Sequence, residues 1–173
     1  YITGDRIIEV GCVELINHIP SGNNLQFYCS TDKKIGEDAI KIHGLTNEFL
    51  NKHLAFKEHL KNFFDFIKSD ILIIHNAEFD VGFINNELKL IGEKPITNKI
   101  IDTTLLARKK LNTRITNLNH LCRRFFIDLS SRKLHGALLD CHLLAGVYLE
   151  LLGGKQTSFD LSELKKNNTD SKN

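Results

Sequence analysis

The chain has 173 residues, of which 42% are hydrophobic and 25% are charged, and its formal net charge is +2. This length and apolar fraction predict one globular domain and exclude a disordered or fibrous protein. No apolar run approaches the ~20 residues of a membrane span, and the 4 cysteines are widely spaced with no C-x-x-C pair. We therefore expect a cytoplasmic protein, neither embedded in a membrane nor built on disulfides.

The hydrophobic pattern predicts a hairpin followed by alternating helices and strands. Arg6 to Ile16 predicts a strand, Asn17 to Asn24 a turn, and Leu25 to Ser30 the returning strand. After an irregular segment through His43-Gly44, helices are expected near 55–69, 78–91, 103–110, 118–125 and 136–152, and strands at 71–74 and 99–102. This order predicts a single α/β domain over residues 1–154, with a mixed sheet flanked by helices, and a flexible tail over 155–173.

Three acidic residues near the starts of predicted helices are candidates for a functional site. Asp80 lies in the first turn of a helix after a buried strand, where it is either functional or a structural residue favoured by the helix N-terminus. Asp140 lies among Ala, Leu and Cys, and a carboxylate is seldom buried unless it is paired or binds a metal; an exposed helix residue is the alternative. For Asp102, capping of the helix that starts at Thr103 is favoured over holding a metal-bound water.

Asp80, Asp140 and His135 together predict a metal-dependent hydrolase. Carboxylate oxygens suit Mg²⁺ or Mn²⁺, and a histidine with an ordinary pKa of about 6.5 suits a general base for water. Two carboxylates are too few for a site with two ions ~3.5–4 Å apart, so the residues alone leave the reaction open. Basic clusters at 108–110, 123–124 and 132–133 could line a phosphate path, although solvated helix faces are favoured.

The segments Asn76 to Asp80 and His135 to Asp140 resemble the second and third motifs of the DEDDh family of 3′–5′ exonucleases. The likeness extends over Asp5 to Gly154 and is greatest to the proofreading exonucleases of bacterial replicative polymerases. The resemblance implies an RNase H-like α/β fold and removal of mispaired nucleotides from a single-stranded or frayed DNA 3′ end, with two divalent ions, Mg²⁺ or Mn²⁺.

The same resemblance implies a role for individual residues. Asp80 and Asp140 correspond to metal ligands, His135 to the general base that deprotonates water, and Asp102 to a residue that supports the metal site from behind. The implied substrate-binding residues are Ile42, His43, Gly44, Leu45, Asn76 and Phe79. For Phe79, packing in the core is the alternative.

The family's first motif, D-x-E on the first strand, has no counterpart between Tyr1 and Asp5. The strand that carries it would lie in the middle of the sheet, and its loss would expose unpaired strand edges. The sequence also contains no Met. We therefore expect the chain to begin inside a longer protein that carries this motif before Tyr1.

The tail contains Gln156, Phe159 and Leu161, in a segment that resembles a sliding-clamp-binding peptide; a random tail is the alternative. The leading interpretation is thus a proofreading exonuclease with the polymerase catalytic subunit and the sliding clamp as partners. A stand-alone DEDDh exonuclease acting on RNA or DNA ends shares every catalytic residue. A non-catalytic binding subunit is the third interpretation if the D-x-E carboxylates are absent, and an unrelated α/β domain the fourth.

Overall fold

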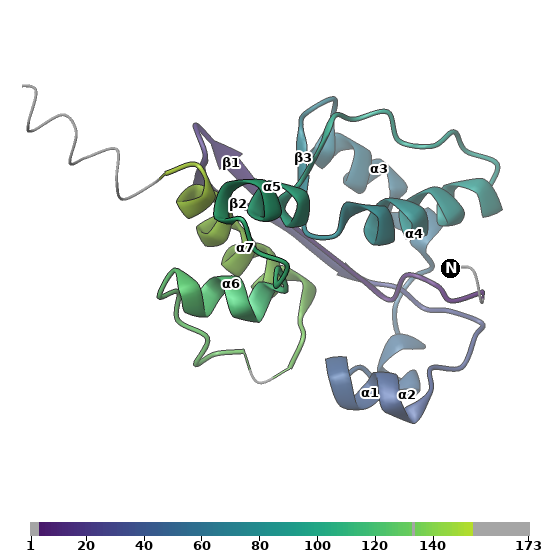
Figure 1. Ribbon diagram of the computed structural model, residues 1–173. Helices are drawn as coiled ribbons and strands as arrows, with labels where there is room; N and C mark the ends of the chain where they lie inside the picture. Colours follow the sequence, from purple (N-terminus) through teal and green to yellow (C-terminus); the bar gives the residue numbers. More distant parts are fainter. Residues whose placement is uncertain (1–3, 133, 154–173) are drawn as a thin grey trace, which may run out of the picture.

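A computed structural model describes residues 4–132 and 134–153. It opens with the expected hairpin, in which β1 (Glu9–Ile16) pairs antiparallel with β2 (Ile19–Tyr28) (Figure 1). The predicted turn over Asn17 to Asn24 was too long: only Asn17 and His18 form it, both with positive φ, as a two-residue hairpin turn requires. The turn-forming residues 20–24 instead lie in β2, where the register shifts opposite Glu14.

Two short helices, α1 (Glu37–His43) and α2 (Asn47–Leu50), occupy the segment expected to be irregular. Gly44 ends α1 with a φ of 77°, and the Thr46 hydroxyl caps α2 by accepting from the Phe49 N–H. Neither helix is long enough to show an apolar stripe, and α1 buries no residue, so only the capping residues signal these helices in the sequence.

The next elements follow the predicted order: α3 (Phe56–Ile67), β3 (Leu72–Ile74), α4 (Ala77–Leu90), β4 (Ile100–Asp102) and α5 (Thr103–Leu111). β3 and β4 are parallel, with Ile74 opposite Asp102. Both strands therefore end at the same level, and each leads directly into a helix. This register brings the start of α4 and the start of α5 side by side.

The last two helices are α6 (Leu118–Arg124) and α7 (Ala137–Leu151). The described residues form two apolar cores. The first joins β2, α3 and α4 through Phe27, Cys29, Phe56, Phe63, Ile67 and Leu88. The second joins α5, α6 and α7 through Ala107, Leu121, Cys122, Leu143, Val147 and Leu151. Among the described residues, no helix combines the length and apolar character that crossing a membrane requires.

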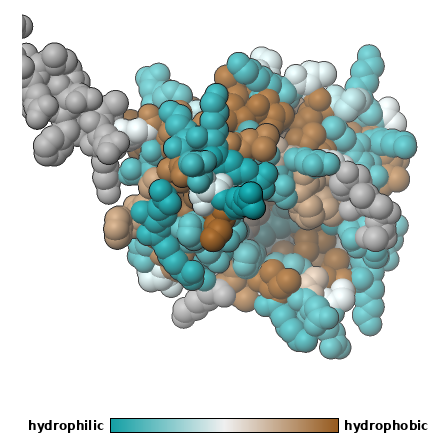
Figure 2. All heavy atoms as spheres, in the orientation of Figure 1, coloured by the Kyte–Doolittle hydropathy of each residue, from teal (hydrophilic) through white to brown (hydrophobic). Residues whose placement is uncertain are grey.

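The expected mixed sheet is present as one antiparallel and one parallel pair, and within the described ranges these two pairs are not hydrogen-bonded to each other. A groove of about 1690 Å³ is lined by both β1 and β3, and by residues of α4 and α7. Apolar side chains are visible between hydrophilic ones across the face shown in Figure 2. Each of β1 and β3 thus has a partner strand on one edge and the groove on the other.

Candidate active site

Asp102 organises the corner where the two parallel strands end. Its carboxylate accepts hydrogen bonds from the N–H groups of Asn76 (3.3 Å) and Ala77 (3.0 Å) at the start of α4. It also accepts from Thr104 (2.7 Å) and Leu105 (3.4 Å) in α5. Burial alone would raise the pKa of this carboxyl, but these hydrogen bonds outweigh it and lower the pKa. The predicted capping role of Asp102 is confirmed, and it extends to two helices.

Asp80 lies one turn into α4, and its side chain lines the groove. The surrounding protein atoms desolvate the carboxylate, and the nearby charge of Asp102 acts in the same direction, although a backbone hydrogen bond opposes both. The result is a pKa raised to about 6. Asp80 therefore carries a negative charge at neutral pH that its surroundings disfavour, which a bound cation would relieve.

Asp140 lies in the first turn of α7 and is paired with Arg132. The guanidinium makes a two-pronged contact, with Nε 2.6 Å from Oδ1 and Nη2 2.6 Å from Oδ2. Its Nη1 also donates to Oδ1 of Asn119 at 2.6 Å. The Arg132 side chain is 6% exposed, so the interpretation of this basic residue as part of a solvated helix face was wrong. Only its position, three residues before His135, could have signalled its role in the sequence.

His135 lies next to the same ion pair. Its Nδ1 is 2.9 Å from Arg132 Nη2 and 3.6 Å from Asp140 Oδ2, and its side chain is 52% exposed. The histidine and the aspartate of the third motif are therefore brought together, as their spacing predicts, with an arginine between them.

A close approach between β1 and α7 positions Asp140. A Cβ atom on Gly11 would lie 2.5 Å from the backbone N of Leu138, so only glycine allows this contact. The Cys141 thiol also donates to the Gly11 carbonyl at 3.2 Å. The start of α7 is thereby fixed against the hairpin.

The segment Ile42–Leu45 contacts the His135 loop directly. The Ile42 carbonyl accepts from the His135 N–H at 3.2 Å, and a Cβ on Gly44 would lie 2.6 Å from Leu134 Cδ1. His43 Nδ1 accepts from the Leu45 N–H at 3.0 Å, and burial lowers the pKa of this imidazole. Ile42 itself is exposed.

The other two substrate-binding candidates lie at the start of α4. Asn76 adopts a left-handed conformation (φ 65°, ψ 57°) and its N–H donates to Thr104 Oγ1 at 3.0 Å as well as to Asp102. Phe79 is 57% exposed and its ring lies against Phe83 at 4.9 Å. The alternative that placed Phe79 in the core is wrong.

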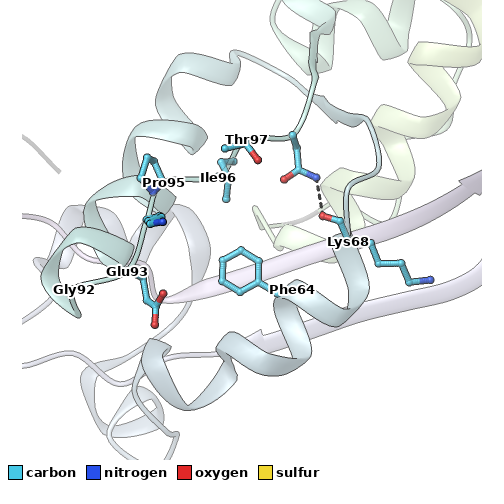
Figure 3. Close-up of a pocket in the computed structure, with 9 residues that line it drawn as sticks. Phe64, Lys68, Gly92, Glu93, Pro95, Ile96 and Thr97 are labelled. Atoms are coloured by element: carbon cyan, nitrogen blue, oxygen red, sulfur yellow. Dashed lines mark hydrogen bonds between the residues drawn. The ribbon is translucent and has the colours of Figure 1, made fainter.

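Five of the candidates line one groove: Asp80, Asp140, His135, His43 and Phe79 all contribute to its wall, as does Arg132. A separate hollow of about 460 Å³ lies between the end of α3 and the loop after α4, where Asn98 Nδ2 donates to the Lys68 carbonyl at 3.1 Å (Figure 3). None of the candidates lines that second hollow. Gln156, Phe159 and Leu161 lie outside the described residues.

The donor chemistry of the groove suits a hard cation only in part. Asp80 and Asp140 offer carboxylate oxygens, one desolvated and one already balanced by a guanidinium. Within residues 4–132 and 134–153, however, no group of three or more His, Cys, Asp or Glu residues could hold a metal ion. The two aspartates therefore fit as part of a larger ligand set.

The whole domain matches a known family. The exonuclease family RNase_T matches residues 2–148, and the chain therefore belongs to this exonuclease family. The fold agrees: the chain superimposes on the nuclease domain of 3′hExo, a DEDDh family member, with a TM-score of 0.75 and 21% identity over 86% of this chain and 81% of that one. A structure of exonuclease X in complex with 5′ overhanging duplex DNA gives a TM-score of 0.67 and 21% identity over 84% and 82%. The RNase H-like fold is confirmed.

Curated relatives place the chain more narrowly. It is 42% identical over 162 residues to the DNA polymerase III subunit epsilon of Rickettsia felis, covering 91% of this chain and 71% of that one. It is 45% identical over 163 residues to the same subunit of Haemophilus influenzae, covering 92% and 64%. The chain is thus a member of the epsilon subunits within the exonuclease family, and a 3′–5′ exonuclease.

Proposed function

We propose that this chain removes mispaired nucleotides from DNA 3′ ends during replication, with Asp80, Asp140 and His135 as its reacting centre. The observation that carries this proposal is that these three side chains line one groove together with Phe79 and His43. In the proposal, the 3′-terminal nucleotide lies against the segment 42–45 and Phe79, while Asn76 fixes the start of α4 beside it. The names of the curated relatives support DNA as the substrate.

Asp80 and Asp140 would hold divalent cations, Mg²⁺ or Mn²⁺, through their carboxylate oxygens. Such ions polarise the phosphate and lower the pKa of a bound water when present. His135 accepts the proton of the attacking water at a ring nitrogen, and its half-exposed position on the segment before α7 gives water and DNA access to it. Asp102 supports this site from behind by holding the start of α4.

Two metal ions require further carboxylates, and we propose that they come from an extended strand in the groove between β1 and β3. In the described residues, β1 pairs only with β2, and β3 only with β4, so each has an edge available to a further strand. A strand there would run past Asp80 and Asp140, which line the same groove. The D-x-E motif expected upstream of Tyr1 has the chemistry for this position.

The polymerase catalytic subunit and the sliding clamp are the proposed partners. The relatives are named as subunits of DNA polymerase III, and Gln156, Phe159 and Leu161 form the candidate clamp-binding peptide. A cytoplasmic location belongs to the same proposal.

Digestion of 5′-labelled single-stranded DNA by the protein with the proposed upstream D-x-E strand included, with labelled RNA of the same sequence alongside, tests this function. With Mg²⁺ or Mn²⁺ we expect a ladder that shortens from the 3′ end, on DNA in preference to RNA, and no products with a chelator. Asp140→Asn should abolish the ladder, whereas His142→Ala, an exposed histidine on the same helix, should leave it unchanged. No digestion by the folded wild-type chain would favour the non-catalytic binding subunit, and equal digestion of RNA would favour the stand-alone nuclease.

A further inference from the structure

The contacts of Arg132 engage both residues of the third motif at once. The guanidinium uses Nε and Nη2 on the two carboxylate oxygens of Asp140, and Nη2 also contacts His135 Nδ1 at 2.9 Å. Asn119 on α6 holds the remaining nitrogen, Nη1. The Arg132 side chain is only 6% exposed, and each of its three guanidinium nitrogens has a hydrogen-bond partner. Two of these nitrogens contact Asp140, the proposed metal ligand.

This contact determines the protonation pattern of His135. A guanidinium has donors but no acceptor, so His135 Nδ1 must be the acceptor in this pair. A neutral imidazole whose Nδ1 accepts carries its hydrogen on Nε2. In this arrangement Nδ1 is occupied and Nε2 is protonated, so neither nitrogen can take a proton from water.

The same contact determines what Asp140 can bind. Both of its oxygens are occupied by the guanidinium, each at 2.6 Å, and a cation approaching the carboxylate has to replace at least one of these hydrogen bonds. A guanidinium and a metal ion also repel each other at such short range, which opposes simultaneous binding.

We propose that Arg132 is a displaceable cation: it occupies the metal-binding face of Asp140 and holds His135 as the Nε2–H tautomer, and the working site forms when it moves away. This inference rests on the proposed roles of Asp140 and His135. When the guanidinium leaves, Asp140 Oδ2, already 3.6 Å from His135 Nδ1, becomes the natural acceptor for an Nδ1–H. That exchange leaves Nε2 without a hydrogen and able to accept one. Arg132 is therefore a positioning residue that acts through its two neighbours.

The first test reads the metal-free protein. We expect ¹⁵N NMR of His135 in the whole chain at about pH 8 to show the Nε2–H tautomer. In Arg132→Met, which keeps the bulk of the side chain but has no donor, the Nδ1–H form should predominate. Arg132→Lys, which keeps the charge but not the fork, covers the case in which the Met variant does not fold. Arg124→Met, an exposed arginine on α6, is the matched control.

The second test measures Mn²⁺ binding by calorimetry in the same proteins. We expect Arg132→Met to bind Mn²⁺ about tenfold more tightly than the wild type, corresponding to loss of a competing contact of about 1.4 kcal/mol. Arg132→Lys should show a smaller increase and Arg124→Met none.

Two results would overturn the inference: an Nδ1–H tautomer in the wild-type metal-free protein, or weaker Mn²⁺ binding by Arg132→Met, which would mean that Arg132 prepares Asp140 for the metal. If Mn²⁺ binds to none of these proteins, the proposed metal function fails, and the tautomer measurement decides the role of Arg132 alone.

Discussion

The two aspartates proposed as metal ligands, Asp80 and Asp140, have opposite electrostatic surroundings. Asp80 is exposed on the groove wall, yet the protein atoms around it desolvate its carboxylate enough to raise the pKa to about 6. Asp140 has a guanidinium on both of its oxygens. Two residues with the same proposed task therefore differ in how their charge is accommodated in the metal-free protein: the charge of Asp80 is disfavoured by its surroundings, whereas the charge of Asp140 is paired with Arg132. A family motif specifies a carboxylate but not how its charge is balanced.

The largest expected effect concerns the proposed general base, which lies on the Asp140 side. His135→Ala should lower turnover by about 10²- to 10⁴-fold, because the reaction loses its general base. Mn²⁺ affinity should change far less, since His135 is not a proposed ligand. Single-turnover digestion and calorimetry on the same preparation measure the two quantities. An equal loss of both would make His135 a structural residue of the site.

Gly11→Ala should disrupt the contact between β1 and α7 that positions Asp140, and leave the surroundings of Asp80 unchanged. The added Cβ would lie 2.5 Å from Leu138 N and 2.6 Å from the Ala137 carbonyl carbon, and backbone atoms there can yield only if α7 shifts. We expect a loss of about 2–3 kcal/mol in unfolding free energy, measured by urea denaturation. Gly36→Ala, where a Cβ meets nothing within 4 Å, is the control. An unchanged midpoint in Gly11→Ala would show that β1 and α7 are less tightly apposed.

Asp102→Ala should disrupt the Asp80 side. It removes hydrogen bonds to the first turns of two helices, and at about 1 kcal/mol for each cap the expected loss is about 2 kcal/mol near neutral pH. Because the folded state lowers the pKa of Asp102, this stabilisation is present above the ordinary pKa and disappears as acid protonates the carboxylate. Thermal unfolding of wild type and variant should therefore differ at pH 7 and converge in acid. If the difference in stability between wild type and Asp102→Ala stayed constant with pH, the lost stability would come from packing and not from the charged carboxylate.

Asp80→Asn should have the smallest effect and the opposite sign. A raised pKa means that ionised Asp80 destabilises the fold above about pH 6, and that this penalty disappears as the pH falls towards the ordinary value of 3.8. We expect the metal-free variant to be more stable by about 1 kcal/mol at pH 8, after allowance for solvent screening, and unchanged near pH 4. Asp140→Asn should instead destabilise the protein, because Arg132 loses its partner. If both substitutions changed the free energy of unfolding in the same direction, the electrostatic contrast between Asp80 and Asp140 would be wrong.

The sequence predicts the elements with long apolar patterns well, and misses those specified by one or two residues. β3, α3 and α7 follow from continuous or periodic apolar residues, and Asp102 follows from its place before Thr103. The helices α1 and α2 were missed because they are too short for periodicity. The turn was predicted too long because Pro20 and Gly22, which usually mark turns, lie at an irregular part of β2.

For the site, the motifs predict which residues meet but not what lies between them. Asp140 and His135 are five residues apart at the start of a helix, so their proximity follows from local geometry. The contacts of Arg132 to Asp140 and to Asn119 depend on how the segment before α7 folds onto α6, which no local pattern encodes. The raised pKa of Asp80 likewise depends on its surroundings in the folded protein, which include the charge of Asp102 at the end of β4.

The carboxylate of Asp102 also has a consequence for how the domain opens. It binds the amides of Ala77 and Thr104, which begin helices following different strands. Neither helix start can separate from this shared acceptor without weakening the other, so the two form one cooperative unit in local unfolding. In hydrogen exchange, these two amides, far apart along the chain, should exchange at a common rate.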